Sequence, residues 1–201
     1  MPSQTQPRDK HCLTSTCYPH IAINHIRGIL SVSIAVLLAC LYPIALFWAA
    51  ISDLTTMTIP NRLTLGLAVA FVPVALLSHL SLTDWGIHLG LGVAGLVLGM
   101  IFFALRFMGG GDAKLLAAAS LWLGFHGFVA LFLYTAIFGG ILTLGLLGLR
   151  QFFSLYGPKL PHWLGQHFEP KGDIPYGIAI CAGGIAALWQ SDFMGGLLLL
   201  P

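Results

Sequence analysis

Residues 29–51 read ILSVSIAVLLACLYPIALFWAAI, a run of 23 residues without a charged side chain. At about 1.5 Å per residue, a helix of this length spans roughly 34 Å, more than the membrane hydrocarbon core of about 30 Å. A secretory signal has a shorter apolar region that begins closer to the N-terminus. We therefore expect this segment to remain in the mature protein as a membrane-spanning helix.

Further apolar stretches recur along the rest of the chain, separated by short polar breaks. They cover residues 63–82, 85–107, 113–149 and 175–200. The stretch 113–149 is too long for one crossing, so we expect it to fold back near Gly124-Phe125-His126-Gly127. The sequence thus predicts an all-α polytopic membrane protein with about six transmembrane helices.

Composition supports this class of protein. The chain is 57% hydrophobic and only 8% charged, with a mean hydropathy of +0.88, whereas soluble domains carry roughly 25% charged residues. The net charge of +2 is too small to indicate nucleic-acid binding. We expect a polar N-terminal tail over residues 1–28 and one membrane-embedded domain over residues 29–201.

The basic residues near the predicted span ends indicate an orientation. Six spans place both termini and the turn at Asp84 on one side, where three basic residues lie: Arg8, Lys10 and Arg27. Six lie on the other side: Arg62, Arg106, Lys114, Arg150, Lys159 and Lys171. Cytoplasmic loops carry an excess of lysine and arginine. The second side is therefore predicted to be cytoplasmic.

Two acidic residues lie at span ends on this predicted cytoplasmic face. Asp53 follows the first span and Asp112 precedes the fourth. Ionisable groups at the edge of an apolar region are costly and usually functional. Two neighbouring carboxyl groups cannot both ionise easily, so they share a proton. One can then take a proton from water while the other polarises a carbonyl, which is the chemistry of peptide hydrolysis without a metal.

Structural roles are the alternative for each of these polar residues. Asp112 could cap the N-terminus of the following helix, and Asp53 could simply end a helix at the membrane interface. Asn61 could cap the second span after Pro60 sets its direction. Lys114 could be an interfacial anchor, or its charge could favour the ionised form of a neighbouring carboxylate.

The tail contains one pair of cysteines, Cys12 and Cys17, flanked by His11 and His20. This pair could hold a metal ion or form a disulfide, but a single Cys-x4-Cys pair is a weak zinc signal. We predict no metal site and no cofactor.

The sequence around each aspartate resembles a motif of the prepilin peptidases, which are type IV prepilin leader peptidases of the GxGD aspartyl protease class. Residues 53–61, DLTTMTIPN, resemble the first motif, an Asp followed by Ile-Pro-Asn or Ile-Pro-Asp. Residues 109–115, GGGDAKL, look like the second motif, Gly-x-Gly-Asp. Residues 174–177, IPYG, are similar to the Pro-Tyr-Gly of the short enzymes that serve tight-adherence (Flp-type) pili. The resemblance covers roughly residues 29–200.

The resemblance implies a multi-pass protease of the bacterial inner membrane that acts at the cytoplasmic face. Its substrates would be prepilins or pseudopilins, cut after a glycine that separates a basic leader from an apolar helix. Its partners would be these substrates and membrane lipid, with no nucleic acid. The catalytic pair would be Asp53 and Asp112. The motif residues that support them would be Gly109, Gly111, Lys114, Ile59, Pro60 and Asn61.

Long members of the family also carry two Cys-x-x-Cys pairs and N-methylate the new terminus. Because no such segment lies between the first spans here, we predict no methyltransferase activity.

The alternative function is a small proton- or cation-coupled transporter component in which the two aspartates relay protons. Acids at span ends, rather than at the bilayer midplane, favour the protease. The sequence leaves open the particular prepilin, the residues needed around its cleavage site, the oligomeric state, and the roles of the tail and the 150–174 loop.

Overall fold

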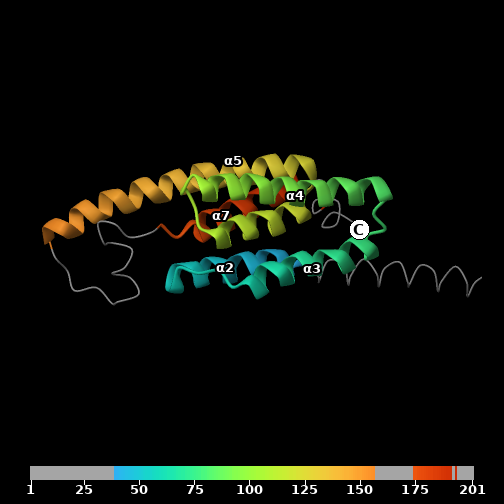
Figure 1. The fold of residues 1–201 in the computed structure, drawn as a ribbon, viewed down its shortest axis with the longest axis horizontal. Coiled ribbons are helices and arrows are strands. Elements are labelled where there is room, and N and C mark those ends of the chain that lie inside the picture. The colour runs from blue at the N-terminus through green and yellow to red at the C-terminus, as the bar shows by residue number, and fades with distance from the viewer. Residues whose placement is uncertain (1–38, 157–173, 192, 194–201) are drawn as a thin grey trace, which may run out of the picture.

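The computed structural model describes residues 39–156, 174–191 and 193. All regular secondary structure within these residues is helical, which confirms the all-α prediction. The elements are α2 (Leu41–Thr56), α3 (Asn61–Leu77), α4 (Leu82–Ala104), α5 (Gly110–Tyr156), α7 (Tyr176–Ala187) and the short 3-10 helix η1 (Leu188–Gln190). These helices run side by side along one long direction (Figure 1). The predicted tail with Cys12 and Cys17, the start of the first span and most of the 150–174 loop lie outside the described residues.

Gly124 divides α5 into two helical segments. Its backbone is non-helical, with φ 68° and ψ −175°. Leu116 and Gly139 would lie roughly 35 Å apart on a continuous helix, yet they line the same cavity. Residues 110–123 (the first α5 segment) and residues 125–156 (the second α5 segment) therefore form a hairpin, and the chain reverses direction between them (Figure 1). This confirms the predicted fold-back.

Helices α3 and α4 end earlier than the apolar stretches 63–82 and 85–107 predicted, at Leu77 and Ala104. Two non-glycine residues just beyond these ends, His79 and Arg106, adopt the left-handed conformation, with φ 52° and 60°. In each case the N–H of the following residue donates to a carbonyl five residues earlier, at 3.3 and 2.9 Å. This Schellman-type capping stops the helix although the apolar sequence continues.

Helix α4 begins with a capping box, which explains why it starts before the predicted position. The Ser81 hydroxyl accepts a hydrogen bond from the N–H of Asp84 at 3.2 Å, and the Asp84 carboxylate accepts one from the N–H of Ser81 at 3.2 Å. These reciprocal bonds satisfy N–H groups at the start of the helix. They give Asp84 a structural role at the start of α4.

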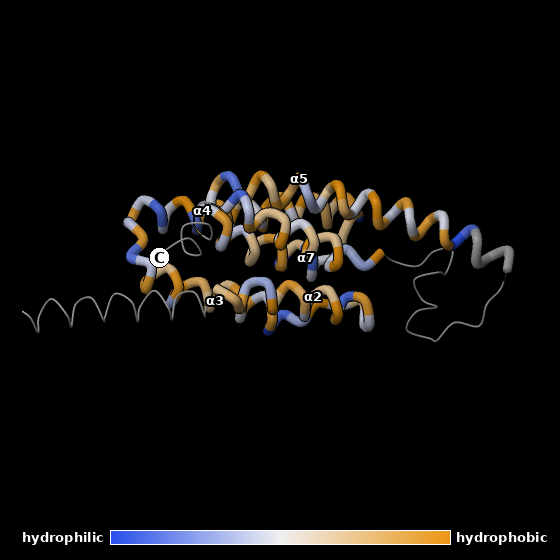
Figure 2. The backbone as a smooth tube through the Cα atoms, turned by 180° about the vertical axis from the view of Figure 1, so that it is seen from behind, coloured by the Kyte–Doolittle hydropathy of each residue, from blue (hydrophilic) through white to orange (hydrophobic). Residues whose placement is uncertain are grey.

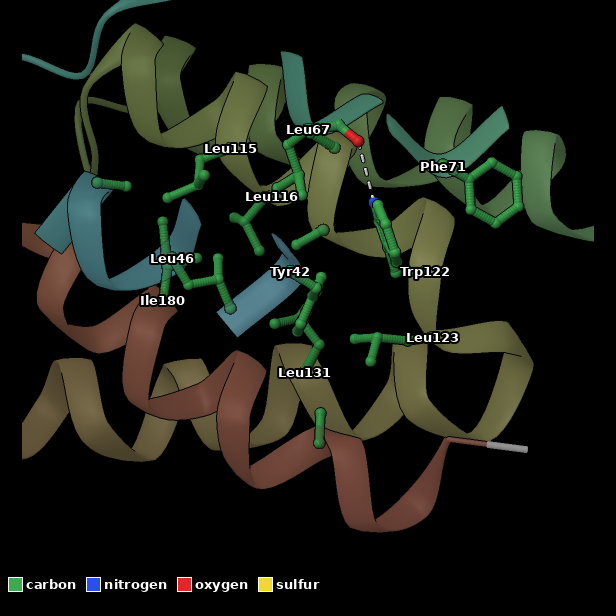
Figure 3. Packing of buried hydrophobic residues seen from close by; sticks show 14 of the residues in the cluster. Tyr42, Leu46, Leu67, Phe71, Leu115, Leu116, Trp122, Leu123, Leu131 and Ile180 are labelled. Atoms are coloured by element: carbon green, nitrogen blue, oxygen red, sulfur yellow. Dashed lines mark hydrogen bonds between the residues drawn. The ribbon is translucent and has the colours of Figure 1, made fainter. Parts of the chain in front are cut away.

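Aromatic side chains join α2, α3 and the first α5 segment in the core (Figure 3). The buried Trp122 indole donates a hydrogen bond to the carbonyl of Leu67 at 3.1 Å, drawn as a dashed line in Figure 3. Its ring centre lies 5.8 Å from that of Tyr42, whose hydroxyl donates to the carbonyl of Gly184 at 3.4 Å. The polar atoms of these buried rings therefore have partners, as buried Tyr and Trp usually require.

Glycines allow the helices to approach closely. A Cβ atom on Gly99 of α4 would lie 2.8 Å from the Cα atom of Ala113 in α5. A Cβ atom on Gly183 of α7 would lie 2.7 Å from the backbone nitrogen of Thr135. Small residues at helix contacts are typical of membrane proteins, where close packing takes the place of a hydrophobic driving force. This packing holds α4 and α7 directly against α5.

The outer surface of the bundle is apolar. Large side chains such as Trp48, Leu65, Val93 and Leu144 are more than half exposed on four different helices, and apolar residues extend along all of them (Figure 2). Among the described residues, Leu82–Ala104 is long and apolar enough to cross a membrane, and the stretch Gly110–Gln151, which Gly124 divides into two segments, passes the same test of length and composition. Such a surface suits lipid better than water, and it indicates a membrane protein.

Candidate active site

Asp53 lies in the last turn of α2, where only 6% of its surface is exposed. Its Oδ2 atom accepts a hydrogen bond from the N–H of Gly177 at 2.7 Å. Gly177 is the second residue of α7, so its N–H has no partner within that helix, and the helix N-terminus favours a negative charge. The start of α7 therefore orients the Asp53 carboxylate and stabilises its charged form.

Gly177 allows this contact because it has no side chain. A Cβ atom at this position would lie 2.8 Å from the Cβ atom of Asp53 and 2.9 Å from its Oδ2 atom. These distances are shorter than real Cβ contacts, so a larger residue would displace Asp53 or α7. Sequence reasoning did not include Gly177 among the site residues. The Pro-Tyr-Gly pattern before the last span was the feature of the sequence that could have pointed to this glycine.

Asp112 is the third residue of α5 and is also only 6% exposed. Its Oδ2 atom accepts a hydrogen bond from the N–H of Gly109 at 3.0 Å. Asp112 thus reaches back from the first turn to the residue before the helix, as in a capping box, and is not itself the N-cap residue. Its Oδ1 atom is buried and has no hydrogen-bond partner within the described parts of the chain. This oxygen can carry a proton without losing a hydrogen bond seen in the described residues.

Both carboxyl groups line one cavity of about 550 Å³ (the aspartate cavity), which confirms that the topology brings them together. They are close enough to interact electrostatically. The end of α4, the loop after it, the second α5 segment and the start of α7 complete the walls. These wall residues include Met57, Phe103, Arg106, Phe107, Met108, Gly109, Thr143, Ile174 and Tyr176. Arg106 places a cation on the wall, a role that sequence reasoning did not predict.

The two sequence motifs are in direct contact. Ile59 is buried, and a Cβ atom on Gly111 would lie 3.2 Å from its Cβ atom. Pro60 follows in an extended conformation as the N-cap residue of α3. A Cβ atom on Gly109 would lie 3.1 Å from the Oδ2 atom of Asp112. Both glycines therefore stand where a side chain would crowd the neighbouring motif or the carboxyl group.

Lys114 and Asn61 form a second link between the motifs. The Lys114 ammonium group donates a hydrogen bond to the Oδ1 atom of Asn61 at 2.9 Å. Asn61 is the first residue of α3 and makes no side-chain cap there, so the alternative role as a helix cap does not apply to it. Both residues line a separate cavity between α3, α4 and the first α5 segment. The lysine thus connects the motifs and is not part of the wall around the two carboxyl groups.

Replacing Lys114 by alanine is expected to lower the rate of the peptide hydrolysis that the sequence predicts by less than about tenfold, because one exposed hydrogen bond contributes about 1 kcal/mol. Asn61→Ala removes the same bond, and the double variant should lose little more than either single variant. Steady-state kinetics of the three variants checks this expectation. A loss as large as that of an aspartate variant would show that the lysine takes part in the chemistry.

No three His, Cys, Asp or Glu side chains gather into a metal-binding group within the described residues. The pair Cys12 and Cys17 lies outside this part of the chain. The absence of a metal site and of a cofactor stays a prediction.

Sequence comparison bears on the two functions considered. The sequence model of the type IV leader peptidase family matches residues 40–144, which are more than half of the chain and include both aspartate motifs. The chain belongs to the type IV leader peptidase family. Membership of this family favours the peptidase, and none of the comparisons supports a transporter.

Curated relatives carry the same family's names. The chain is 32% identical over 192 residues to a prepilin leader peptidase/N-methyltransferase from Aeromonas hydrophila and to one from Aeromonas salmonicida (strain A449). Each match covers 87% of this chain and 59% of the relative. The chain thus spans about three fifths of the length of these relatives. No solved structure matches it.

Proposed function

We propose that the chain is a membrane aspartyl endopeptidase that removes the leader peptide of prepilins or pseudopilins after a glycine. The observation that carries the proposal is the pairing of two buried carboxyl groups, Asp53 and Asp112, in one cavity. Both residues lie inside the segment that matches the peptidase family. The names of the relatives support prepilins as the class of substrate.

Each carboxyl group accepts one N–H at a helix N-terminus, Asp53 from Gly177 and Asp112 from Gly109, which suits a site that holds one ionised carboxylate. The second oxygen of Asp112 suggests how the two roles are divided. Asp112 keeps a buried oxygen without a partner among the described residues, which suits the group that holds a proton and donates it to the substrate carbonyl. We assign Asp53 as the general base and Asp112 as the general acid.

Peptide cleavage then proceeds in two steps. The water oxygen bonds to the scissile carbon while its proton passes to Asp53 and the proton of Asp112 passes to the carbonyl oxygen. In the second step the carbonyl reforms, and the proton on its oxygen returns to Asp112. The proton on Asp53 passes to the departing nitrogen while the carbon–nitrogen bond breaks. The products are the leader with a new carboxyl end and the mature protein with a new amino end. Both aspartates return to their starting states.

The placement that we propose is a multi-pass protein with six spans in the bacterial inner membrane and the aspartate cavity at the cytoplasmic face. The excess of basic residues on that side supports it. Asp84 lies in the first turn of α4, whereas Phe103 of the cavity wall lies near the other end, roughly 29 Å away along the helix. This separation supports opposite membrane faces for the two sites. The products would serve assembly of a pilus, such as an Flp-type pilus, or of a secretion system.

The proposal covers peptide cleavage only. The names of the relatives also include N-methyltransferase, but the chain spans 59% of those proteins. The expectation that this chain lacks methyltransferase activity stays a prediction.

Purified protein in detergent is expected to cut a synthetic substrate that has a lysine-containing leader, a glycine and an apolar segment of about 20 residues. Zinc chelators and serine-protease reagents should leave the rate unchanged, because two carboxyl groups and water suffice for the reaction. Mass spectrometry of the products locates the cut. Inhibition by a chelator that added zinc reverses would contradict the proposed mechanism.

A further inference from the structure

Arg106 is the one basic residue among the described residues that line the aspartate cavity. The other charged residues on this wall are Asp53 and Asp112, so a single cation accompanies two carboxyl groups. Two further basic residues, Arg62 near the start of α3 and Lys114 near the start of α5, line separate cavities. Within the described part of the chain, the positive charge at the wall of the aspartate cavity therefore comes from Arg106.

The two carboxyl groups are positioned by the main chain. Asp53 accepts the N–H of Gly177 at 2.7 Å. Asp112 accepts the N–H of Gly109 at 3.0 Å. Each carboxyl group therefore has a main-chain donor, and neither needs the Arg106 guanidinium to hold its orientation. Arg106 itself is exposed, and its flexible side chain leaves the guanidinium accessible to a ligand that enters the cavity.

The turn at Arg106 does not depend on its side chain. The backbone there is left-handed, with φ 60°, a conformation that is unfavourable for residues with a side chain and open to glycine. Two main-chain hydrogen bonds hold the turn, from the N–H of Arg106 to the carbonyl of Phe103 at 3.0 Å and from Phe107 to Phe102 at 2.9 Å. A glycine at this position can form the same turn with less strain, so Arg106→Gly removes the cation while keeping the local fold.

Peptide hydrolysis creates a new anion in this cavity. The scissile peptide bond is neutral before cleavage, whereas the leader ends in a carboxylate afterwards. This carboxylate forms beside Asp53 and Asp112, where a further negative charge is unfavourable. A guanidinium offsets that charge and presents paired N–H donors that match the two oxygens of a carboxylate. Arg106 thus supplies an interaction that the product can use and the uncut peptide bond cannot.

We propose that Arg106 binds the new carboxylate at the end of the cleaved leader, which makes the leader with a free carboxyl end a ligand of the aspartate cavity. This inference rests on the proposed function, because that function supplies the leader as a product. Arg106 is accordingly a product-binding residue and takes no part in the proton transfers. The cleaved leader competes with uncut substrate through this contact.

Two synthetic leader peptides test the proposal. They share one lysine-containing sequence that ends in glycine, and they differ only in ending with a free carboxylate or with a carboxamide. Isothermal titration calorimetry with purified protein in detergent gives the Kd of each peptide without requiring cleavage. The variants are Arg106→Gln, Arg106→Lys and Arg106→Gly. The matched control is Arg62→Gln, which removes a basic residue that lines a different cavity between α2 and α3.

The wild type and Arg62→Gln are expected to bind the carboxylate peptide about tenfold more tightly than the carboxamide, as a charge-assisted hydrogen bond provides. Arg106→Gln and Arg106→Gly should abolish this preference. Arg106→Lys should keep part of it, because lysine retains the charge but lacks the paired donors. Arg106→Gly should also unfold at the same temperature as wild type or at a higher one, which a structural role of the arginine would not allow.

Equal affinities of the wild type for the two peptides, or a preference that persists in Arg106→Gln, would overturn the proposal. A preference that is lost equally in Arg62→Gln would also overturn it, since the effect would then reflect overall charge rather than contact. If neither peptide binds while the wild type cleaves the synthetic substrate, the product site is wrong and the protease stands. No cleavage of that substrate by the wild type overturns the proposed function itself.

Discussion

Replacing Asp53 or Asp112 by asparagine is expected to lower the cleavage rate by a factor of roughly 10² to 10⁴, the usual contribution of a positioned acid or base. The amide has the shape of the carboxyl group, and its oxygen can still accept the N–H of Gly177 or Gly109. The fold should therefore persist while proton transfer is lost. Kinetics of the purified variants on the synthetic substrate measures the effect.

Asp84→Asn is the matched control for these variants. This third acid lies in the first turn of α4 and bonds Ser81, away from the aspartate cavity. Asparagine can also accept the N–H of Ser81, so the rate should remain within about twofold of wild type. Wild-type activity in either Asp53→Asn or Asp112→Asn would show that the two carboxyl groups do not form the catalytic pair.

Gly177→Ala is expected to lower activity by roughly 100-fold or more, although it adds only one methyl group. The new Cβ atom would lie 2.8 Å from the Cβ atom of Asp53, so the carboxylate or α7 must move. A displacement of about 1 Å at a catalytic group is enough for a loss of this size. Activity and thermal stability are measured together, and activity should fall much further than stability does.

Gly90→Ala provides the comparison for Gly177→Ala. A Cβ atom on Gly90 of α4 meets nothing within 4 Å, so this variant should keep both its activity and its stability. If Gly177→Ala were as active as Gly90→Ala, the contact between the start of α7 and Asp53 would have no role in catalysis.

The sequence was sufficient to single out Asp53 and Asp112 as candidates because each lies in a local motif at the end of an apolar stretch, and the structure places both in one cavity. Length alone predicted the fold-back at Gly124, since the stretch 113–149 exceeds one membrane crossing. The hydrogen bond between Gly177 and Asp53 could not be predicted in this way. It joins residues that are 124 positions apart and depends on how α7 packs against α2.

The helix ends show another limit of sequence reasoning. His79 and Arg106 adopt the left-handed conformation that usually indicates a glycine, so the sequence there contains no standard stop signal. The side chain of Asn61 likewise bonds Lys114 rather than capping its own helix. The local sequence allowed Asn61 either to cap α3 or to bond another residue. The contact between α3 and α5 determined that it bonds Lys114.

The most direct test of the proposed function is co-expression with a candidate prepilin, followed by the mass and N-terminal sequence of the pilin. Wild type should yield a shorter pilin whose new terminus follows a glycine, while Asp53→Asn and Asp112→Asn, confirmed in the membrane, should yield the uncut form. The same shortened pilin in the presence of either variant would contradict the assignment of Asp53 and Asp112 as the catalytic pair.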